Sequence, residues 1–271
     1  MPLVEVGNTR LHYERTGSGE PLVLVHGSWV DRRSWSTLVP FLEPSFEVVI
    51  YDRRGHGRSE GDPGSGSALE DAEDLAALIE SLGMAPANVL GNSFGGSITL
   101  VLAARRPELL RSLSVHEPPL FGLLAGEPGM GAEMDAVGEH LATVVGTIES
   151  GDHEQAARLF VEEVALGPGS WENVLTPEIR SSMVENAPTF PDEIRDQESF
   201  GMDPATLRDF PHPALLTRGN QSPDFRVRPL DVIGRALPGW RQATIPGAGH
   251  VPQLSHPEVY ARLITEFFRS A

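Results

Sequence analysis

The chain has 271 residues, 40% of them hydrophobic, which suits one catalytic core with an insertion and supplies enough apolar surface for a substantial buried core. Its 21 basic and 38 acidic residues give a formal charge of −17, which repels nucleic acid and anionic membranes. The absence of cysteine excludes disulfides, cysteine-ligated zinc and a cysteine nucleophile.

The first residues lack the basic segment and the apolar run of a signal peptide. No stretch approaches the roughly 20 apolar residues that are needed to span a bilayer. We therefore expect a cytoplasmic protein, a monomer or a homodimer, that binds neither nucleic acid nor membrane.

Eight short segments are predicted to be strands. The first two alternate around Gly7 and Asn8, which indicates an antiparallel pair at the edge of a sheet. The other six are short apolar runs without alternation, which are typical of strands covered on both faces of a parallel sheet. The eight segments span residues 3–6, 9–14, 21–25, 46–51, 87–90, 113–115, 214–217 and 242–245.

Helical patterns lie between several of these strands. Apolar residues recur at helical spacing over 67–82, and Gly83 follows as a C-cap. Residues 94–106 are apolar and stop before Pro107, and residues 257–268 again carry apolar side chains at helical spacing. Strands that alternate with helices predict a doubly wound α/β sheet.

Residues 119–202 interrupt this alternation. They carry no strong strand signal, and they predict helices over 134–149, 153–165 and 177–186, separated by glycines and prolines. A helical insertion between two strands predicts a cap over one end of the sheet. We therefore expect a core formed by residues 1–118 and 203–271, and a helical cap or lid formed by residues 119–202.

A predicted strand runs directly into Gly91-Asn92-Ser93-Phe94-Gly95, and a helix follows. This is G-x-S-x-G in the strand–turn–helix context of a nucleophile elbow. The serine must stand clear of a sharp turn, where larger side chains two residues away would collide. The N-terminus of the following helix favours developing negative charge. Ser93 is the predicted nucleophile.

The strand that ends at Val25 continues into His26-Gly27-Ser28-Trp29. A turn at this place supplies a backbone N–H that faces the nucleophile, and the residue after the serine supplies a second. We predict an oxyanion hole from the amides of Ser28 and Phe94, with Gly27 as the alternative to Ser28. We expect His26 to shape this loop.

The last strand leads into Gly247-Ala248-Gly249-His250, and a helix follows. A histidine on such a loop can lean over the carboxyl edge of the sheet, where Ser93 is expected to stand. There it can take the serine proton and return it to the leaving group. His250 is therefore the predicted base, and His256 is expected to be structural.

These segments together resemble the α/β-hydrolase superfamily, and the match covers nearly the whole chain outside the insertion. It includes His26-Gly27, the segment 51–59 (Tyr-Asp-Arg-Arg-Gly-His-Gly-Arg-Ser), the turn around Ser93, and Gly247-Ala248-Gly249-His250. The resemblance implies an α/β-hydrolase fold, with a mostly parallel eight-stranded sheet flanked by helices. It implies catalysis without a metal or an organic cofactor. The resemblance says little about the substrate.

The acid of the triad departs from the common pattern. In most relatives an aspartate stands three residues beyond a glycine, but that position after Gly219 holds Ser222. Asp224 can replace it if the loop reaches back, and Glu117 can replace it from the end of the strand over 113–115. A glutamate at that strand end is similar to the zearalenone lactonases, and haloalkane dehalogenases also place their acid there. We favour Glu117 and keep Asp224 as the alternative.

The predicted reaction is hydrolysis of a hydrophobic carboxylic ester or lactone through an acyl-enzyme on Ser93. Carbon–carbon bond hydrolysis and cofactor-free peroxidase chemistry reuse the same triad, and a hydrolase-like receptor for a small molecule is a non-catalytic alternative. The expected partner is a small hydrophobic ester or lactone. The residues predicted to line its pocket are Trp29, Phe121, Leu124, Trp171 and Val251.

Overall fold

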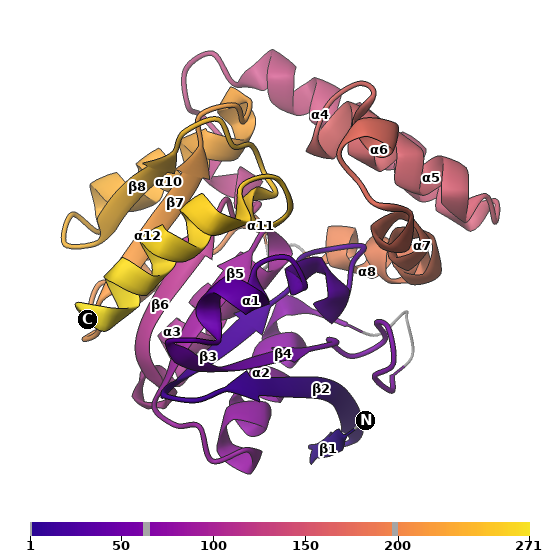
Figure 1. Cartoon of the computed structure of the whole chain (residues 1–271). Helices are drawn as coiled ribbons and strands as arrows, with labels where there is room; N and C mark the ends of the chain where they lie inside the picture. Colours follow the sequence, from indigo (N-terminus) through magenta and orange to yellow (C-terminus); the bar gives the residue numbers. More distant parts are fainter. Residues whose placement is uncertain (1, 62–65, 197–199) are drawn as a thin grey trace.

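An eight-stranded sheet forms the centre of the molecule in the computed structural model, which describes residues 2–61, 66–196 and 200–271 (Figure 1). Its strand order is β1-β2-β4-β3-β5-β6-β7-β8. The pairs β1–β2 and β2–β4 are antiparallel, and the other pairings are parallel. The predicted mostly parallel, eight-stranded sheet is therefore confirmed. The strands are β1 (Leu3–Val6), β2 (Thr9–Gly17), β3 (Glu20–Val25), β4 (Phe46–Tyr51), β5 (Ala87–Asn92), β6 (Leu110–His116), β7 (Ala214–Gly219) and β8 (Arg241–Ile245).

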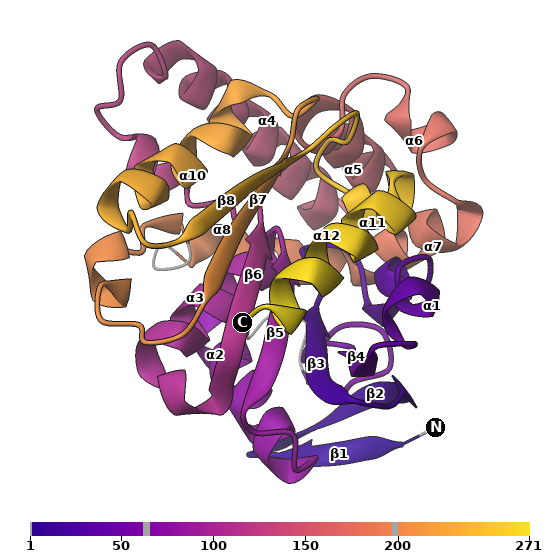
Figure 2. The ribbon, with the colours of Figure 1, turned by 60° about the vertical axis from the view of Figure 1, so that its left-hand side comes forward.

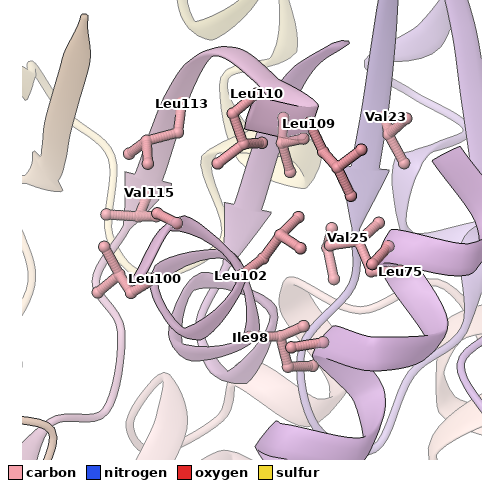
Figure 3. Packing of buried hydrophobic residues seen from close by; sticks show 14 of the residues in the cluster. Val23, Val25, Leu75, Ile98, Leu100, Leu102, Leu109, Leu110, Leu113 and Val115 are labelled. Carbon is pink, nitrogen blue, oxygen red and sulfur yellow. The ribbon is translucent and has the colours of Figure 1, made fainter. Parts of the chain in front are cut away.

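Helices cover both faces of this sheet. On one face α2, α3 and α10 pack against the strands, and on the other face α1 and α12 do so. Figure 3 shows the first of these layers, in which Leu75 of α2 and Leu102 of α3 lie near Val25 of β3, and Leu100 of α3 lies near Val115 of β6. The sandwiching helices are α1 (Val39–Leu42), α2 (Ala68–Ser81), α3 (Phe94–Arg105), α10 (Asp224–Ala236), α11 (Pro252–Ser255) and α12 (Pro257–Arg269).

A run of helices connects β6 to β7 and lies beside the carboxyl ends of the central strands (Figures 1 and 2). We call residues 121–195 the helical segment. Trp29, which follows β3, belongs to the apolar cluster of this segment, so the segment is packed onto the edge of the sheet. Its elements are η3 (Phe121–Leu124), α4 (Gly131–Glu149), α5 (His153–Leu159), η4 (Phe160–Ala165), α6 (Ser170–Asn173), α7 (Pro177–Asn186), η5 (Ala187–Thr189) and α8 (Phe190–Arg195).

The structure departs from the predicted helices: the short helices α1, α6 and α8 were not predicted, and two longer segments also differ. The helix expected over 153–165 ends at Leu159 and continues as one wide π-turn, η4. The helix α10 was not predicted, because Pro229 lies inside it and reads as a helix breaker. The strand predicted over 113–115 is longer in the structure, Leu110–His116, because the polar residues Arg111, Ser112 and His116 in it gave no apolar signal. No helix in the described part of the chain is long and apolar enough to cross a membrane.

Candidate active site

Ser93 stands on the turn between β5 and α3 with a strained backbone. Its φ of 54° and ψ of −125° lie outside the usual regions for a residue with a side chain. The turn closes only because glycines flank it: a Cβ on Gly91 would lie 2.3 Å from the carbonyl oxygen of Gly95, and a Cβ on Gly95 would lie 2.2 Å from that of Val25. The collision expected from the sequence therefore has identified partners, and one of them belongs to β3.

The loop after β3 passes directly over Ser93. A Cβ on Gly27 would lie 3.0 Å from the Cβ of Ser93, so this close approach requires glycine. Ser28 and Ser93 line the same cavity. Phe94 is the first residue of α3, and the first N–H groups of a helix have no acceptor within the helix. The amides predicted to form an oxyanion hole thus lie on the two chain segments next to Ser93.

His26 takes no part in the cavity lining and is fully buried behind the loop. Its Nε2 accepts a hydrogen bond from the backbone N–H of Arg53 at 2.9 Å, and its Nδ1 lies 2.9 Å from the carbonyl oxygen of Gly27. Burial lowers the pKa of His26 to about 3, which keeps the ring neutral. These contacts fix the loop, in line with the role expected for His26.

The His250 ring is held from behind by Glu117. The Nδ1 of His250 lies 2.8 Å from Oε2 of Glu117, and Oε1 of Glu117 accepts the backbone N–H of Gly219 at 2.8 Å. Both residues are buried. This contact fixes the proton on Nδ1 and leaves Nε2 as the atom able to accept one.

The two alternatives for the acid lie in different places. Asp224 begins α10 with 67% of its side chain exposed and faces Arg228 at 3.7 Å, so the structure does not bring it to His250. Ser222, at the position where the common pattern has its acid, is half-buried, and its buried hydroxyl lies near Glu117 without meeting the geometry of a hydrogen bond. Of the two candidate carboxylates, only Glu117 contacts the histidine.

Burial and charge set the protonation states in this site. Burial and the nearby Arg226 cation lower the pKa of His250 to about 4, against the opposing effect of Glu117. Burial alone would raise the pKa of Glu117, but His116 and His250 hold it well below its ordinary value. At neutral pH the pair is therefore a neutral imidazole and a carboxylate, which is the resting state of a general base with its orienting acid.

The cavity at Ser93 has two lobes, which share Ser28, Ser93 and Phe160. The first, the apolar lobe, also contains His250 and Val251 and is otherwise lined mainly by aliphatic side chains such as Leu175 and Met183. The second, the arginine lobe, is lined by Pro119, Phe121, Leu141, Val164, Phe190, Ile194, Phe200 and Arg226.

The predicted pocket residues divide between lining and packing. Val251 lines the apolar lobe and Phe121 lines the arginine lobe. Trp29, Leu124 and Trp171 are not among the residues that line either lobe. Trp29 is buried behind Phe160, with ring centroids 5.0 Å apart. Leu124 packs among Met130, Val137 and Phe225, and Trp171 packs inside the helical segment.

Three polar residues of the site were missed by sequence reasoning. The side chain of Asn92 donates to the carbonyl oxygen of His250 at 3.0 Å and accepts from Gln253 at 3.1 Å, which ties the serine turn to the histidine loop. Arg226 of α10 places a guanidinium nitrogen 3.1 Å from Nε2 of His250. Asn92 was visible as the variable residue in the G-x-S motif, whereas no sequence signal distinguishes Arg226 from the other arginines.

Some residues of the site could also serve as ligands of a metal ion. Within the described ranges, His116, Glu117 and His250 bring potential ligand atoms within 4.8 Å of one another. The His116 ring lies 3.0 Å from the hydroxyl of Thr217 and 3.3 Å from the carbonyl oxygen of Gly249, and His250 faces Glu117. These donors are already engaged in a hydrogen-bonded network, which fits a proton relay better than a cation site.

Three non-glycine residues in the described ranges have positive φ, namely Trp29, Ser93 and Glu117. They follow β3, β5 and β6, which are consecutive neighbours in the sheet. Backbone strain of this kind costs on the order of 1–3 kcal/mol per residue and concentrates at functional sites. The strain therefore marks the same edge of the sheet as the serine and the histidine.

Comparisons with known proteins agree on the family. The chain matches the alpha/beta hydrolase family over residues 22–263. It is 30% identical to the pimeloyl-[acyl-carrier protein] methyl ester esterase of Methylococcus capsulatus, over 96% of this chain and 99% of that protein. It is 28% identical to the 2-hydroxy-6-oxononadienedioate/2-hydroxy-6-oxononatrienedioate hydrolase of Burkholderia vietnamiensis, over 96% and 91%. Another curated relative is 36% identical over only 42% of this chain and 43% of its own length.

The fold is likewise shared with solved structures. An alpha/beta hydrolase from Sphaerobacter thermophilus superposes with a TM-score of 0.79 and 26% identity, covering 98% of this chain and all of that one. The match to the family extends over most of the sheet and over both segments that carry the serine and the histidine. This chain belongs to the alpha/beta hydrolase family and has its fold.

Proposed function

We propose that this protein hydrolyses a carboxylic ester or lactone through an acyl-enzyme on Ser93. The observation that carries the proposal is the 2.8 Å contact between Glu117 and Nδ1 of His250, in a site where His250 and Ser93 line one cavity. A carboxylate, a neutral imidazole and a serine on a strained turn are the parts that acyl transfer needs. The esterase from Methylococcus capsulatus supports the same class of reaction.

The proposed reaction has two steps. Oγ of Ser93 attacks the substrate carbonyl while Nε2 of His250 takes the hydroxyl proton. The amides of Ser28 and Phe94 hold the oxyanion, with Gly27 as the alternative to Ser28. The intermediate then expels the alcohol, which receives the proton from His250. Water attacks the acyl-enzyme by the same route and releases the acid.

The cavity supports a substrate with a sizeable apolar part. The apolar lobe lies next to both Ser93 and His250, and its lining is mainly aliphatic. The helical segment supplies much of this lining, so we propose that residues 119–202 act as the cap. The resemblance to zearalenone lactonases remains a prediction that rests on the placement of Glu117.

A fluorophosphonate probe tests the nucleophile directly. We expect one covalent adduct on the peptide that contains Ser93, detected by mass spectrometry, and none in Ser93→Ala. Ser97 is the matched control, because it lies one turn further along α3, is buried, and lines neither lobe. Ser97→Ala should still be labelled. Labelling of Ser93→Ala at the wild-type rate would overturn the assignment.

Carbon–carbon bond hydrolysis is the second candidate, because the chain is similar over nearly its whole length to the oxononadienedioate hydrolase of Burkholderia vietnamiensis. Parallel assays with a p-nitrophenyl ester and a ring-cleavage diketone separate the two reactions. Faster turnover of the ester supports the first proposal, and faster turnover of the diketone supports the second. Slow, near-stoichiometric turnover of both would favour a receptor.

A further inference from the structure

Arg226 is a buried cation in the active-site cavity. Its side chain extends from α10 into the arginine lobe, and the residue is only 3% exposed. One guanidinium nitrogen lies 3.1 Å from Nε2 of His250, and the other donates to the carbonyl oxygen of Val164 at 2.8 Å. Nε is buried and has no partner within the described residues.

Three other buried arginines each contact a carboxylate, whereas Arg226, within the described ranges, does not. Arg32 contacts Asp52 at 3.0 Å, Arg53 contacts Asp71 at 2.6 Å, and Arg54 contacts Asp74 at 2.7 Å. For Arg226, in the part of the chain that the structure describes, both identified partners are neutral groups. Burial lowers the pKa of Arg226 to about 10, which leaves it charged at neutral pH. The Glu117 carboxylate, on the far side of the His250 ring, opposes this effect of burial, but no ion pair joins it to Arg226 among the described residues. A buried charge without a counter-ion in direct contact is costly, and an anion that enters the cavity would offset this cost.

The location of Arg226 identifies the anion's source. The arginine lobe contains Ser93 and Ser28, so an anion held there would belong to the molecule that Ser93 attacks. Phe121 and Phe200 flank the lobe and keep it apolar, which strengthens a charge-assisted hydrogen bond. One guanidinium matches one singly charged carboxylate.

The contact with His250 adds a second consequence. Nε2 is the atom that must receive the serine proton, and in this structure it faces a guanidinium donor. A substrate anion competes for the same donor. Movement of the guanidinium from Nε2 to a carboxylate would leave the base free at the moment when the substrate is bound.

We propose that Arg226 is a specificity-determining residue that binds a free carboxylate on the substrate and, in doing so, releases His250. The inference rests on the proposed function and narrows it to esters or lactones that also carry a carboxylate. The apolar part of such a substrate occupies the apolar lobe.

Two esters of matched length test this proposal, namely the mono-p-nitrophenyl ester of glutaric acid and p-nitrophenyl pentanoate. We expect wild type to have the higher kcat/KM for the anionic ester. Arg226→Met should lower the anionic-to-neutral ratio of kcat/KM by roughly 10- to 150-fold, the range expected for a hydrogen bond between charged groups. Arg226→Lys should retain part of the preference. An unchanged ratio in Arg226→Met would overturn the proposal.

Arg228 provides the matched control for charge. It lies two residues further on the same helix, faces Asp224 on the surface and lines neither lobe. Arg228→Met removes the same charge from the protein, and we expect it to keep the wild-type ratio. An equal loss of preference in Arg228→Met would assign the effect to net charge and would overturn a specific role for Arg226.

The pH dependence of kcat/KM distinguishes an electrostatic role of Arg226 from a role in packing, because a change in packing alone would leave its acidic limb in place. Because the Arg226 cation disfavours a protonated His250, its removal raises the pKa of the base. With the neutral ester, the acidic limb of kcat/KM should therefore move to higher pH in Arg226→Met. A limb at the wild-type position would contradict the contact with the base.

Binding to Ser93→Ala separates failure of this inference from failure of the proposed function. Monomethyl glutarate should bind Ser93→Ala in calorimetry more tightly than the neutral methyl pentanoate, and the double variant Ser93→Ala/Arg226→Met should lose that difference. If neither p-nitrophenyl ester is hydrolysed but monomethyl glutarate still binds through Arg226, the proposed function fails and the carboxylate site stands. If monomethyl glutarate binds Ser93→Ala no better than methyl pentanoate does, the carboxylate site fails, and this test does not depend on the folding of Arg226→Met.

Discussion

The carboxyl edge of the sheet and the helical segment above it are built in different ways. At the sheet edge, backbone fits against backbone: Gly27, Gly91 and Gly95 permit approaches that a Cβ would block. The helical segment is attached by side chains. Ser182 donates to Asp31 at 2.9 Å, and Asn186 accepts the N–H of Gly57 at 2.9 Å.

This difference predicts which parts of the molecule tolerate amino-acid substitution. Contacts between backbones fix the serine and its neighbours independently of most side chains, so the catalytic geometry resists substitution elsewhere. Contacts between side chains can be exchanged one at a time, which allows the lining of the cavity to vary. The helical segment is thus the part of the lining expected to vary most freely, whereas Ser93, His250 and Arg226 belong to the sheet core.

Glu117→Gln is expected to have the largest effect on activity, because it removes the carboxylate that holds His250 at the edge of the sheet. The uncharged amide cannot stabilise the imidazolium, and its NH₂ group favours the wrong tautomer of His250. We expect kcat/KM for a p-nitrophenyl ester to fall by roughly 10⁴-fold with an unchanged circular dichroism spectrum. Asp224→Asn is the control and should stay within about twofold of wild type. Full activity of Glu117→Gln together with an inactive Asp224→Asn would reverse the assignment of the acid.

Glu193→Gln is expected to weaken the attachment of the helical segment to the rest of the protein. Glu193 of α8 contacts Arg53, and both side chains are buried. Removing this charge leaves Arg53 paired with Asp71 alone and costs one buried charge-assisted hydrogen bond, so we expect the free energy of unfolding to drop by about 2 kcal/mol. Denaturant titration checks this value. The neighbouring Asp192→Asn, at a surface pair with Arg195, should cost less than about 1 kcal/mol. Equal losses in the two variants would mean that the buried pair does not anchor the segment.

Phe160→Ala gives the smallest expected effect and tests whether selectivity resides in the helical segment. Phe160 lines both lobes, so its truncation should join them and admit longer or branched acyl chains. We expect the ratio of kcat/KM for long and short p-nitrophenyl esters to rise about tenfold. The exposed Phe41→Ala serves as the control and should leave the ratio unchanged. A wild-type ratio in Phe160→Ala would indicate that the lobes do not determine chain length.

The strands of the sheet were predictable because burial on both faces produces unbroken apolar runs, as in β3 and β4. The site could be anticipated where chemistry constrains the residue type. Ser222 in the usual acid position pointed to Glu117, and Glu117 does contact His250.

The remaining features depend on burial and packing. In the sequence Arg226 cannot be distinguished from a surface arginine. It is unusual only because it is buried and donates to the carbonyl oxygen of Val164. Trp29 ends the expected oxyanion loop, but its positive φ accompanies a ring that stacks on Phe160 and packs at a tilt against Phe190, behind the cavity. Neither side-chain direction follows from spacing along the chain.

The helical segment leaves the sheet after β6 and returns at β7, and these two strands are hydrogen-bonded neighbours. A segment whose ends meet at adjacent strands can be replaced by another of different length without moving the sheet. Chimaeras that graft the equivalent region of a relative onto this core should therefore fold, provided that the donor brings a carboxylate to Arg53. Such grafts would offer a practical route to new selectivity while leaving Ser93, Glu117 and His250 in place.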